Sequence, residues 1–170
     1  PVRSVTVGRG PFGFSSFQTV SHDSFTLIKG QMRLAQSDSW TLNRSIDGSA
    51  SMTVGPIGAT AALQINPYGS GLPTLASLVR DFKPVSVTYN YGPTAKYASA
   101  PGRPAVSSTP SWTIGTDAFA FTRSITKTQT FYNQSLAVNT GQVRVSSSSR
   151  WTLVNGVDGS LSITVGDLPV

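Results

Sequence analysis

Few residues in this chain could carry out covalent chemistry. Its 170 residues include no cysteine, no glutamate and a single histidine, His22. His22 stands beside Asp23, but adjacent residues of an extended chain point to opposite faces, so they form no catalytic pair by themselves. No Gly-x-Ser-x-Gly motif supports a serine hydrolase, and the missing cysteines argue against a transition-metal site. We therefore predict that the protein is not an enzyme and uses no cofactor or metal.

Basic residues are the stronger functional candidates. Lysine and arginine number 13 against 7 acids, and the net charge is +6. A positive surface attracts polyanions through the release of counterions, although a merely solvated basic face is the alternative. We predict that the basic residues of the first quarter of the chain contact nucleic acid: Arg3, Arg9, Lys29, Arg33 and Arg44.

Three tryptophans could form a platform that stacks on sugars. Trp40, Trp112 and Trp151 each lie in a stretch that alternates like a β-strand. That pattern favours a place in the core over an exposed platform. A carbohydrate-binding sandwich stays the alternative function.

Alternating residues predict a chain made mostly of short strands. The first clear signal runs from Trp40 to Ile46, and the second from Ser49 to Val54, with Asp47-Gly48 between them. Only a loop with an odd number of residues puts the apolar side chains of both strands on one face. We therefore expect a three-residue loop from Asp47 to Ser49, with a positive φ at Gly48.

That loop implies specific cross-strand pairs, and its sequence recurs near the C-terminus. The predicted pairs are Ile46 with Ala50 and Leu42 with Val54. Residues 151–166 repeat residues 40–55 at a constant offset, and ten of the sixteen positions are identical. We interpret the repeat as two hairpins that use the same turn, because the sequence between them does not repeat.

Other segments complete an all-β fold. Apolar residues at helical spacing, led by Pro73, predict one short helix from Leu72 to Phe82. We expect an antiparallel β-sandwich of the jelly-roll type, with residues 1–20 as an N-terminal arm or extended segment and residues 21–170 as one shell domain. Residues 1–17 resemble an arm or loop more than a strand, and no stretch has the composition of a membrane span. Further strands are predicted at residues 25–28, 85–91, 112–114, 118–122, 128–132 and 142–145.

The middle of the chain resembles a known family. Residues 63–67 read Leu-Gln-Ile-Asn-Pro, the predicted helix follows, and residues 85–93 form an alternating strand that ends in Tyr-x-Tyr-x-Pro. This order of strand, helix and strand is similar to the jelly-roll capsid proteins of small icosahedral positive-strand RNA viruses, such as the tombusvirus, sobemovirus and nodavirus-like shells. The chain has no match to the Asp-x-x-Asp calcium motif found in those families.

The resemblance implies a structural function. We expect a capsid protein of a virion that assembles with copies of itself into an icosahedral shell and packages single-stranded RNA, without a membrane partner. A charged fraction of only 12% suits flat contacts between subunits. The alternatives are the carbohydrate- or receptor-binding sandwich and a hydrolase that depends on His22.

Overall fold

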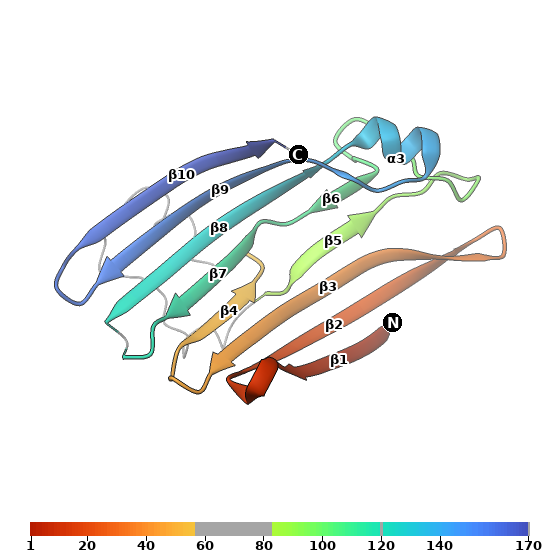
Figure 1. Ribbon diagram of the computed structural model, residues 1–170. Helices are drawn as coiled ribbons and strands as arrows, with labels where there is room; N and C mark the ends of the chain where they lie inside the picture. Colours follow the sequence, from red (N-terminus) through yellow and green to blue (C-terminus); the bar gives the residue numbers. More distant parts are fainter. Residues whose placement is uncertain (57–82, 120, 170) are drawn as a thin grey trace.

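Antiparallel β-strands make up most of the structure. The computed structural model describes residues 1–56, 83–119 and 121–169. Within these residues ten strands form one sheet, accompanied by the short α-helix α3 (Figure 1). The prediction of an all-β, antiparallel sandwich is confirmed. The helix expected between Leu72 and Phe82 lies outside the described residues.

The strands vary widely in length, and β2 and β3 are the longest. Their bounds are β1 (Val2–Arg9), β2 (Ser15–Ile28), β3 (Gln31–Ser45), β4 (Ala50–Val54), β5 (Val85–Tyr89), β6 (Val106–Ser108), β7 (Ser111–Thr116), β8 (Thr122–Tyr132), β9 (Val145–Gly156) and β10 (Leu161–Pro169). Helix α3 is Gln134–Thr140, and a 3₁₀ turn, η1 (Pro11–Gly13), joins β1 to β2.

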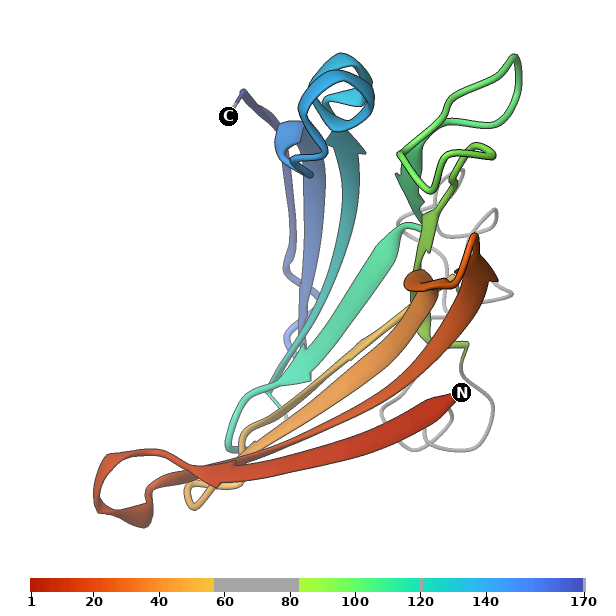
Figure 2. The same cartoon turned by 90° about the vertical axis from the view of Figure 1, so that its right-hand side faces the viewer.

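Strand β3 is the branch point of the sheet. Its second half pairs with β4 and its first half with β5, which in turn pairs with β6. The main path of the sheet runs β1-β2-β3-β4-β7-β8-β9-β10. Figure 2 shows that the wall of β8, β9 and β10 faces the wall that holds β5 and β6. Most neighbours on the main path are also consecutive in the chain, so the described strands form a meander and not the Greek-key order of a jelly roll.

Eight strands share one local pattern, a threonine flanked by two side chains that are mostly apolar. Because successive side chains of a strand point to opposite faces, the threonine lies on one face and its neighbours on the other. The strand registers align these threonines across the whole main path of the sheet. We call them the threonine row: Thr6, Thr19, Thr41, Thr53, Thr113, Thr126, Thr152 and Thr164.

Residues that flank the threonines form two further rows on the opposite face, the apolar rows. Their central members are the main core, in which Met52, Val54, Trp112, Ile114 and Ile125 are at most 1% exposed. The first row is Val5, Val20, Trp40, Val54, Trp112, Lys127, Trp151 and Val165; the second is Val7, Gln18, Leu42, Met52, Ile114, Ile125, Leu153 and Ile163. The apolar rows therefore begin on β1 and end on β10, and at both ends their side chains are exposed.

Neighbouring threonines of the row alternate between two kinds of contact. The side-chain hydroxyls are hydrogen-bonded in the pairs Thr19–Thr41 at 3.0 Å, Thr53–Thr113 at 2.9 Å and Thr126–Thr152 at 3.0 Å. In an antiparallel ladder, pairs without backbone hydrogen bonds bring their side chains closer together than backbone-bonded pairs do. Turn hydrogen bonds such as Ser45 N–H to Ser49 O fix this alternation for the β3–β4 pair. The row thus links strands through side chains wherever the backbone does not bond.

The turn between β3 and β4 has three residues, as predicted, and Gly48 adopts a φ of +89°. Its position is shifted by one residue, because the Ser45 N–H donates to Ser49 O and closes the loop around Ile46, Asp47 and Gly48. The Asp47 carboxylate accepts a hydrogen bond from the Ser49 N–H at 2.9 Å, which holds Asp47 inside the turn.

This shift changes the predicted partners. Leu42 pairs with Met52 and not with Val54. Ile46 lies in the turn and is 71% exposed, so it does not pair with Ala50. The parity argument was correct, because both apolar sets share one face, but the pairs that it named were wrong.

The C-terminal hairpin repeats the same turn. The Gly156 N–H donates to Ser160 O, Gly159 has a φ of +82°, and the Asp158 carboxylate accepts from the Ser160 N–H at 2.9 Å. The repeated sequence therefore specifies a repeated turn geometry, as predicted.

Three segments differ from the prediction. Of residues 142–145, expected to be a strand, only Val145 lies in one, at the start of β9. Residues 1–17 were expected to be an arm or loop, yet Val2–Arg9 pairs with β2 along its whole length. Residues 118–122 were expected to be a strand, but residues 118 and 119 lie in a turn and β8 begins only at Thr122. The Asp117 carboxylate accepts hydrogen bonds from the N–H groups of Phe121 and Thr122, which closes that turn.

Helix α3 was not predicted. Its first turn is capped by the Asn133 side chain, which accepts from the Leu136 N–H at 2.9 Å, and Gly141 ends it with a φ of +74°. Ala137 of α3 packs against Val106 in a second, smaller core. The helix is only seven residues long, so its capping residues were a better signal than its apolar periodicity.

Trp112 is the largest fully buried side chain, so its truncation should destabilise the fold strongly. We expect Trp112→Ala to lower the free energy of unfolding by about 3–5 kcal/mol, because it removes buried surface and leaves a cavity. Urea denaturation measures this. Val157→Ala, at a position 77% exposed, is the control and should change stability by less than about 0.5 kcal/mol. Equal effects of the two variants would contradict the core described above.

The two aspartates of the repeated turns should stabilise the fold only when they are ionised. Hydrogen bonds from the backbone and hydroxyl of Ser49 lower the pKa of Asp47, and those from the hydroxyl and backbone of Ser160 lower the pKa of Asp158. A carboxyl with a lowered folded-state pKa stabilises the fold above its unfolded-state pKa and loses that contribution as the pH falls.

We therefore expect Asp47→Asn/Asp158→Asn to be less stable than the wild type at neutral pH. The difference should shrink as the pH falls below 3.8, the ordinary pKa of an aspartate. Urea denaturation at several pH values measures it. A difference that does not change with pH would assign the effect to something other than the charge.

Candidate nucleic-acid interface

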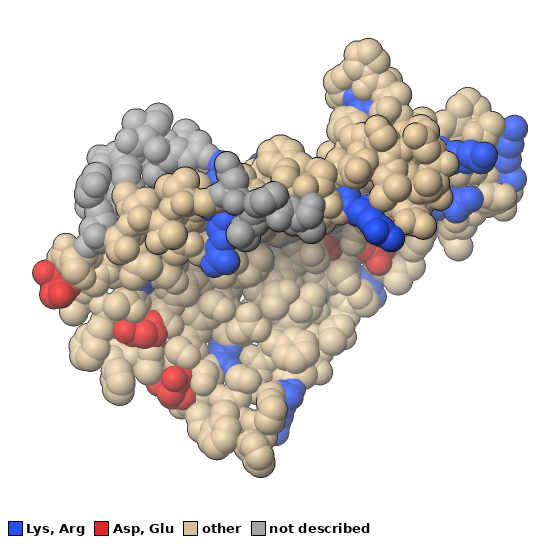
Figure 3. All heavy atoms as spheres, turned by 45° about the horizontal axis from the view of Figure 1, so that its top comes forward, with Lys and Arg blue, Asp and Glu red and all other residues tan. Residues whose placement is uncertain are grey.

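One end of the sheet is basic and contains no acid in its described segments. The antiparallel registers bring the β2–β3 turn, the connection between β5 and β6, and helix α3 with its flanks to this end. Residues 26–34, 90–105 and 132–145 include no aspartate or glutamate. We call this region the basic end; its cations are Lys29, Arg33, Lys96, Arg103 and Arg144. All five are exposed, and Figure 3 shows a cluster of Lys and Arg side chains on the right, with others spread over the centre and left and acids on the left and near the centre.

A hollow of about 270 Å³ lies within the basic end. Its lining includes Arg33 and Lys96, the rings of Tyr91 and Tyr97, and residues at the end of α3. The two tyrosine rings are stacked, with centroids 4.9 Å apart and an interplanar angle of 21°. Cations beside aromatic rings form a surface that can bind a phosphate and stack a base of a single-stranded nucleic acid.

Local structure places these side chains. A tight turn at residues 92–95 brings Tyr91 opposite Tyr97 in an isolated β-bridge, and the Gly92 N–H donates to Lys96 O at 2.9 Å. On the neighbouring strand β3, the Arg33 guanidinium donates to the Gln31 side chain at 2.7 Å. The two cations therefore come from separate segments, Arg33 from β3 and Lys96 from the turn that follows Tyr91.

Tyr91 and Tyr89 at the basic end have raised pKa values. Burial, followed by a hydrogen bond with Tyr97, raises the pKa of the Tyr91 hydroxyl. Burial also raises the pKa of Tyr89, which packs beside the small core under α3. These hydroxyls therefore add no negative charge that would repel a phosphate.

Of the residues predicted to contact nucleic acid, the structure brings only two to the basic end. Lys29 lies at the tip of the β2–β3 turn with a φ of +49°, and Arg33 lines the hollow. Arg9 and Arg44 lie near the opposite end of the sheet, where both line a hollow of about 260 Å³ with Ser15 and Ser45. Arg3 projects from the edge strand β1 on the face of the apolar rows.

Three cations of the basic end escaped the sequence analysis. Lys96 and Arg103 belong to the proline-rich connection, and Arg144 follows α3. The available signal was the absence of acids: residues 82–116 contain no aspartate or glutamate, so their few cations are uncompensated. Sequence clustering in the first quarter of the chain was the wrong criterion, because the sheet separates those residues.

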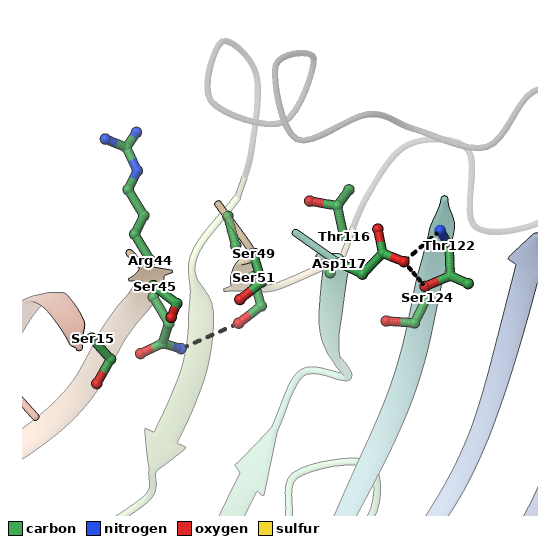
Figure 4. Close-up of a pocket in the computed structure, with 12 residues that line it drawn as sticks. Ser15, Arg44, Ser45, Ser49, Ser51, Thr116, Asp117, Thr122 and Ser124 are labelled. Atoms are coloured by element: carbon green, nitrogen blue, oxygen red, sulfur yellow. Dashed lines mark hydrogen bonds between the residues drawn. The ribbon is translucent and has the colours of Figure 1, made fainter. Parts of the chain in front are cut away.

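Another hollow, of about 350 Å³, lies at the end opposite the basic end (Figure 4). It is lined mostly by hydroxyl groups of β3, β4, β7 and β8, together with Arg44 and Asp117. The Asp117 carboxylate is already engaged by Thr122, through its N–H and hydroxyl, each at 3.0 Å. Its lining includes no histidine or lysine that could activate a hydroxyl, so this hollow offers no catalytic pair.

The tryptophans do not form a sugar platform. Trp112 is fully buried, and Trp40 and Trp151 pack against the same core. Trp112 and Trp151 meet edge to face with ring centroids 5.4 Å apart, and the Lys127 ammonium lies 5.6 Å from the Trp112 ring. The prediction that these residues belong to the core is confirmed.

The described residues hold no group of three His, Cys, Asp or Glu side chains arranged for a metal. His22 is exposed on β2, where it pairs with Arg3 of β1 and Asp38 of β3. No helix in the described part of the chain is long and apolar enough to cross a membrane.

Comparisons with protein-family models, with curated proteins and with solved structures found no match to this chain. Most of the segment that resembles capsid proteins, residues 63–82, lies outside the described residues, while residues 85–89 form the predicted strand, β5.

Neutralising the basic end should weaken binding to single-stranded RNA. We expect Lys29→Gln/Arg33→Gln/Lys96→Gln to reduce the slope of log affinity against log salt by about 2, because each lost phosphate contact contributes about 0.7. Fluorescence anisotropy with an unstructured oligonucleotide measures this.

The matched control removes the same amount of charge elsewhere. Arg3→Gln/Arg9→Gln/Arg44→Gln replaces three of the residues predicted from sequence alone and should change the salt slope much less. If this control weakens binding more than the first variant, the basic end is not the interface.

Proposed function

We propose that this chain is a structural subunit that assembles with copies of itself into an icosahedral shell around single-stranded RNA, as the capsid protein of a small positive-strand RNA virus does. The observation that carries the proposal is the state of the two sheet edges. Among the described strands, β1 pairs only with β2, and β10 pairs only with β9. Both edge strands expose apolar side chains.

Soluble monomers protect such edges. They use inward-pointing charges, prolines, bulges or short strands, because an open edge is a template for another chain. Here β1 and β10 extend over eight and nine residues, and neither shows a register shift. Val7 of β1 is 71% exposed, and Val165 of β10 is 77% exposed. A partner that pairs with these edges explains both the long, regular edge strands and their exposed apolar side chains.

The basic end supports RNA as the cargo of such a shell. The segments that carry its five cations contain no acid, and two of these cations lie beside stacked tyrosines in the hollow. With a net charge of +6 per chain, a shell of about sixty copies carries several hundred positive charges, enough to condense RNA by counterion release. Weak contacts repeated over many copies also stabilise subunits that are marginal alone.

A direct test is the assembly state of the purified protein. We expect round, uniform particles in negative-stain electron microscopy and a single fast boundary in sedimentation velocity once single-stranded RNA is added. Particles should retain RNA through size-exclusion chromatography, measured by the ratio of absorbance at 260 and 280 nm.

Protein that stays monomeric at high concentration, with and without RNA, would overturn the proposal. Particles that form equally well without RNA and exclude it would support assembly but reject RNA as the cargo.

A further inference from the structure

We propose that the contact between subunits is a head-to-tail pairing of strand β1 of one copy with strand β10 of the next, which continues the sheet across the subunit boundary. This inference rests on the proposed self-assembly and specifies its geometry. The two strands lie at opposite ends of the main path of the sheet, far apart in Figure 1, so one copy cannot pair them with each other.

On both edge strands, every second residue points its backbone N–H and C=O groups away from the sheet, where another strand could bond to them. The Gly10 N–H donates to Ser15 O, and this bond sets the phase of the β1–β2 ladder. Since hydrogen-bonding residues alternate along an antiparallel strand, the even-numbered residues of β1 bond to β2. The odd-numbered residues point their N–H and C=O groups outward: Arg3, Val5, Val7 and Arg9.

The same reasoning applies to β10. The Gly156 N–H donates to Ser160 O, so the even-numbered residues of β10 bond to β9. The outward-facing backbone groups of β10 belong to Leu161, Ile163, Val165 and Asp167. Both edge strands therefore present the backbone N–H and C=O groups of their odd-numbered residues. A pairing between the two strands must set odd-numbered residues of one opposite odd-numbered residues of the other.

One register between β1 and β10 continues the threonine row and both apolar rows into the next copy. It sets Val5 of one copy opposite Val165 of the next, and Val7 opposite Ile163. These residues are the two ends of the first and second apolar rows, and they are 51%, 77%, 71% and 43% exposed, respectively. Pairing them extends both apolar rows into the next copy and covers the exposed ends. The full length of β1 finds a partner in this register.

The threonine row continues in the same register. Thr6 then lies opposite Thr164 in a pair without backbone hydrogen bonds, because both strands use their odd-numbered residues for the joint. Inside the subunit, the three threonine pairs of this kind are hydroxyl-bonded at 2.9–3.0 Å. A Thr6–Thr164 pair between copies would be the fourth, so the alternation along the row would pass through the boundary unbroken.

Strand direction and charge favour the same joint. The main path has eight strands in antiparallel alternation, so β10 of one copy and β1 of the next, placed in line, are again antiparallel. Pairing two β1 strands over their full length would instead set Arg3 of each copy opposite Arg9 of the other, and like charges directly opposite destabilise a sheet.

A head-to-tail contact uses two different surfaces, so it propagates beyond a dimer. Such contacts generate closed rings when the rotation between copies closes, and open filaments when it does not. The sheet is strongly curved (Figure 2), and repeated addition of curved sheets carries that rotation from copy to copy.

Disulfide cross-linking tests the register directly, because the chain has no cysteine of its own. We expect Thr6→Cys/Thr164→Cys, mildly oxidised at assembling concentrations, to give a ladder of dimers, trimers and larger species on a non-reducing gel. Neither single variant should give more than traces of dimer. Both threonines are exposed at sheet edges, so the substitutions should leave the fold intact, which circular dichroism verifies.

The matched control is Thr6→Cys/Ser162→Cys. Ser162 lies on the same face of β10, two residues from Thr164, which moves its Cα about 8 Å from that of Thr6 in the proposed register, beyond the reach of a disulfide. It should cross-link far less than the in-register pair. A ladder from the control, or strong dimers from a single variant, would overturn the proposed pairing.

A second experiment does not depend on cysteine. Val165→Lys places a charge at the proposed joint and should abolish assembly, whereas Val157→Lys, at a position equally exposed, should leave it unchanged. If wild-type particles form while the in-register pair gives no ladder and Val165→Lys still assembles, the edge pairing is wrong and self-assembly stands. A wild type that forms no assemblies and a double variant that gives no ladder would overturn both.

Discussion

The alignment of one threonine per strand across the sheet is the constraint on which the rest of the structure depends. A shift of one residue in any strand would turn its threonine to the core face and its apolar neighbours to the other face. Hydroxyl bonds such as Thr53–Thr113 hold the alignment at pairs where the backbone does not bond. Register, core and the exposed ends of the apolar rows all follow from this alignment, because each is defined by the residues beside the threonines.

The same constraint separates the two kinds of surface that the proposed function needs. Along the strand direction, the charge is placed at the ends of the sheet, and the basic end collects Lys29, Arg33 and Lys96. Across the strands, the sheet is nearly uncharged in its central rows and ends in two edge strands that pair with only one neighbour each among the described strands. Contacts between copies and contacts with a polyanion therefore use perpendicular directions of one sheet, and neither has to compete with the other.

Sequence patterns predicted what is local and missed what is long-range. The repeated Asp-Gly turns follow from residues within three positions of each other, so the odd loop and the positive φ of Gly48 were predictable. The pairs across that loop were not, because the hydrogen bond from the Ser45 N–H to Ser49 O closes the loop one residue earlier than predicted. Placing Arg9 and Arg33 in one site failed for a similar reason, since nearness in sequence says little about nearness across strands this long.

A stronger prediction was available from the triplets themselves. Trp40-Thr41-Leu42 and Trp151-Thr152-Leu153 were noticed as a repeat, but Val5-Thr6-Val7 and Ile163-Thr164-Val165 carry the same pattern on the edge strands. These triplets align in the register of the main path, although β2 and β8 contribute Thr19 and Thr126 with one polar neighbour each. An edge strand that carries the pattern of an interior strand is built to have neighbours on both sides, and that property connects the internal register of this subunit to its proposed assembly.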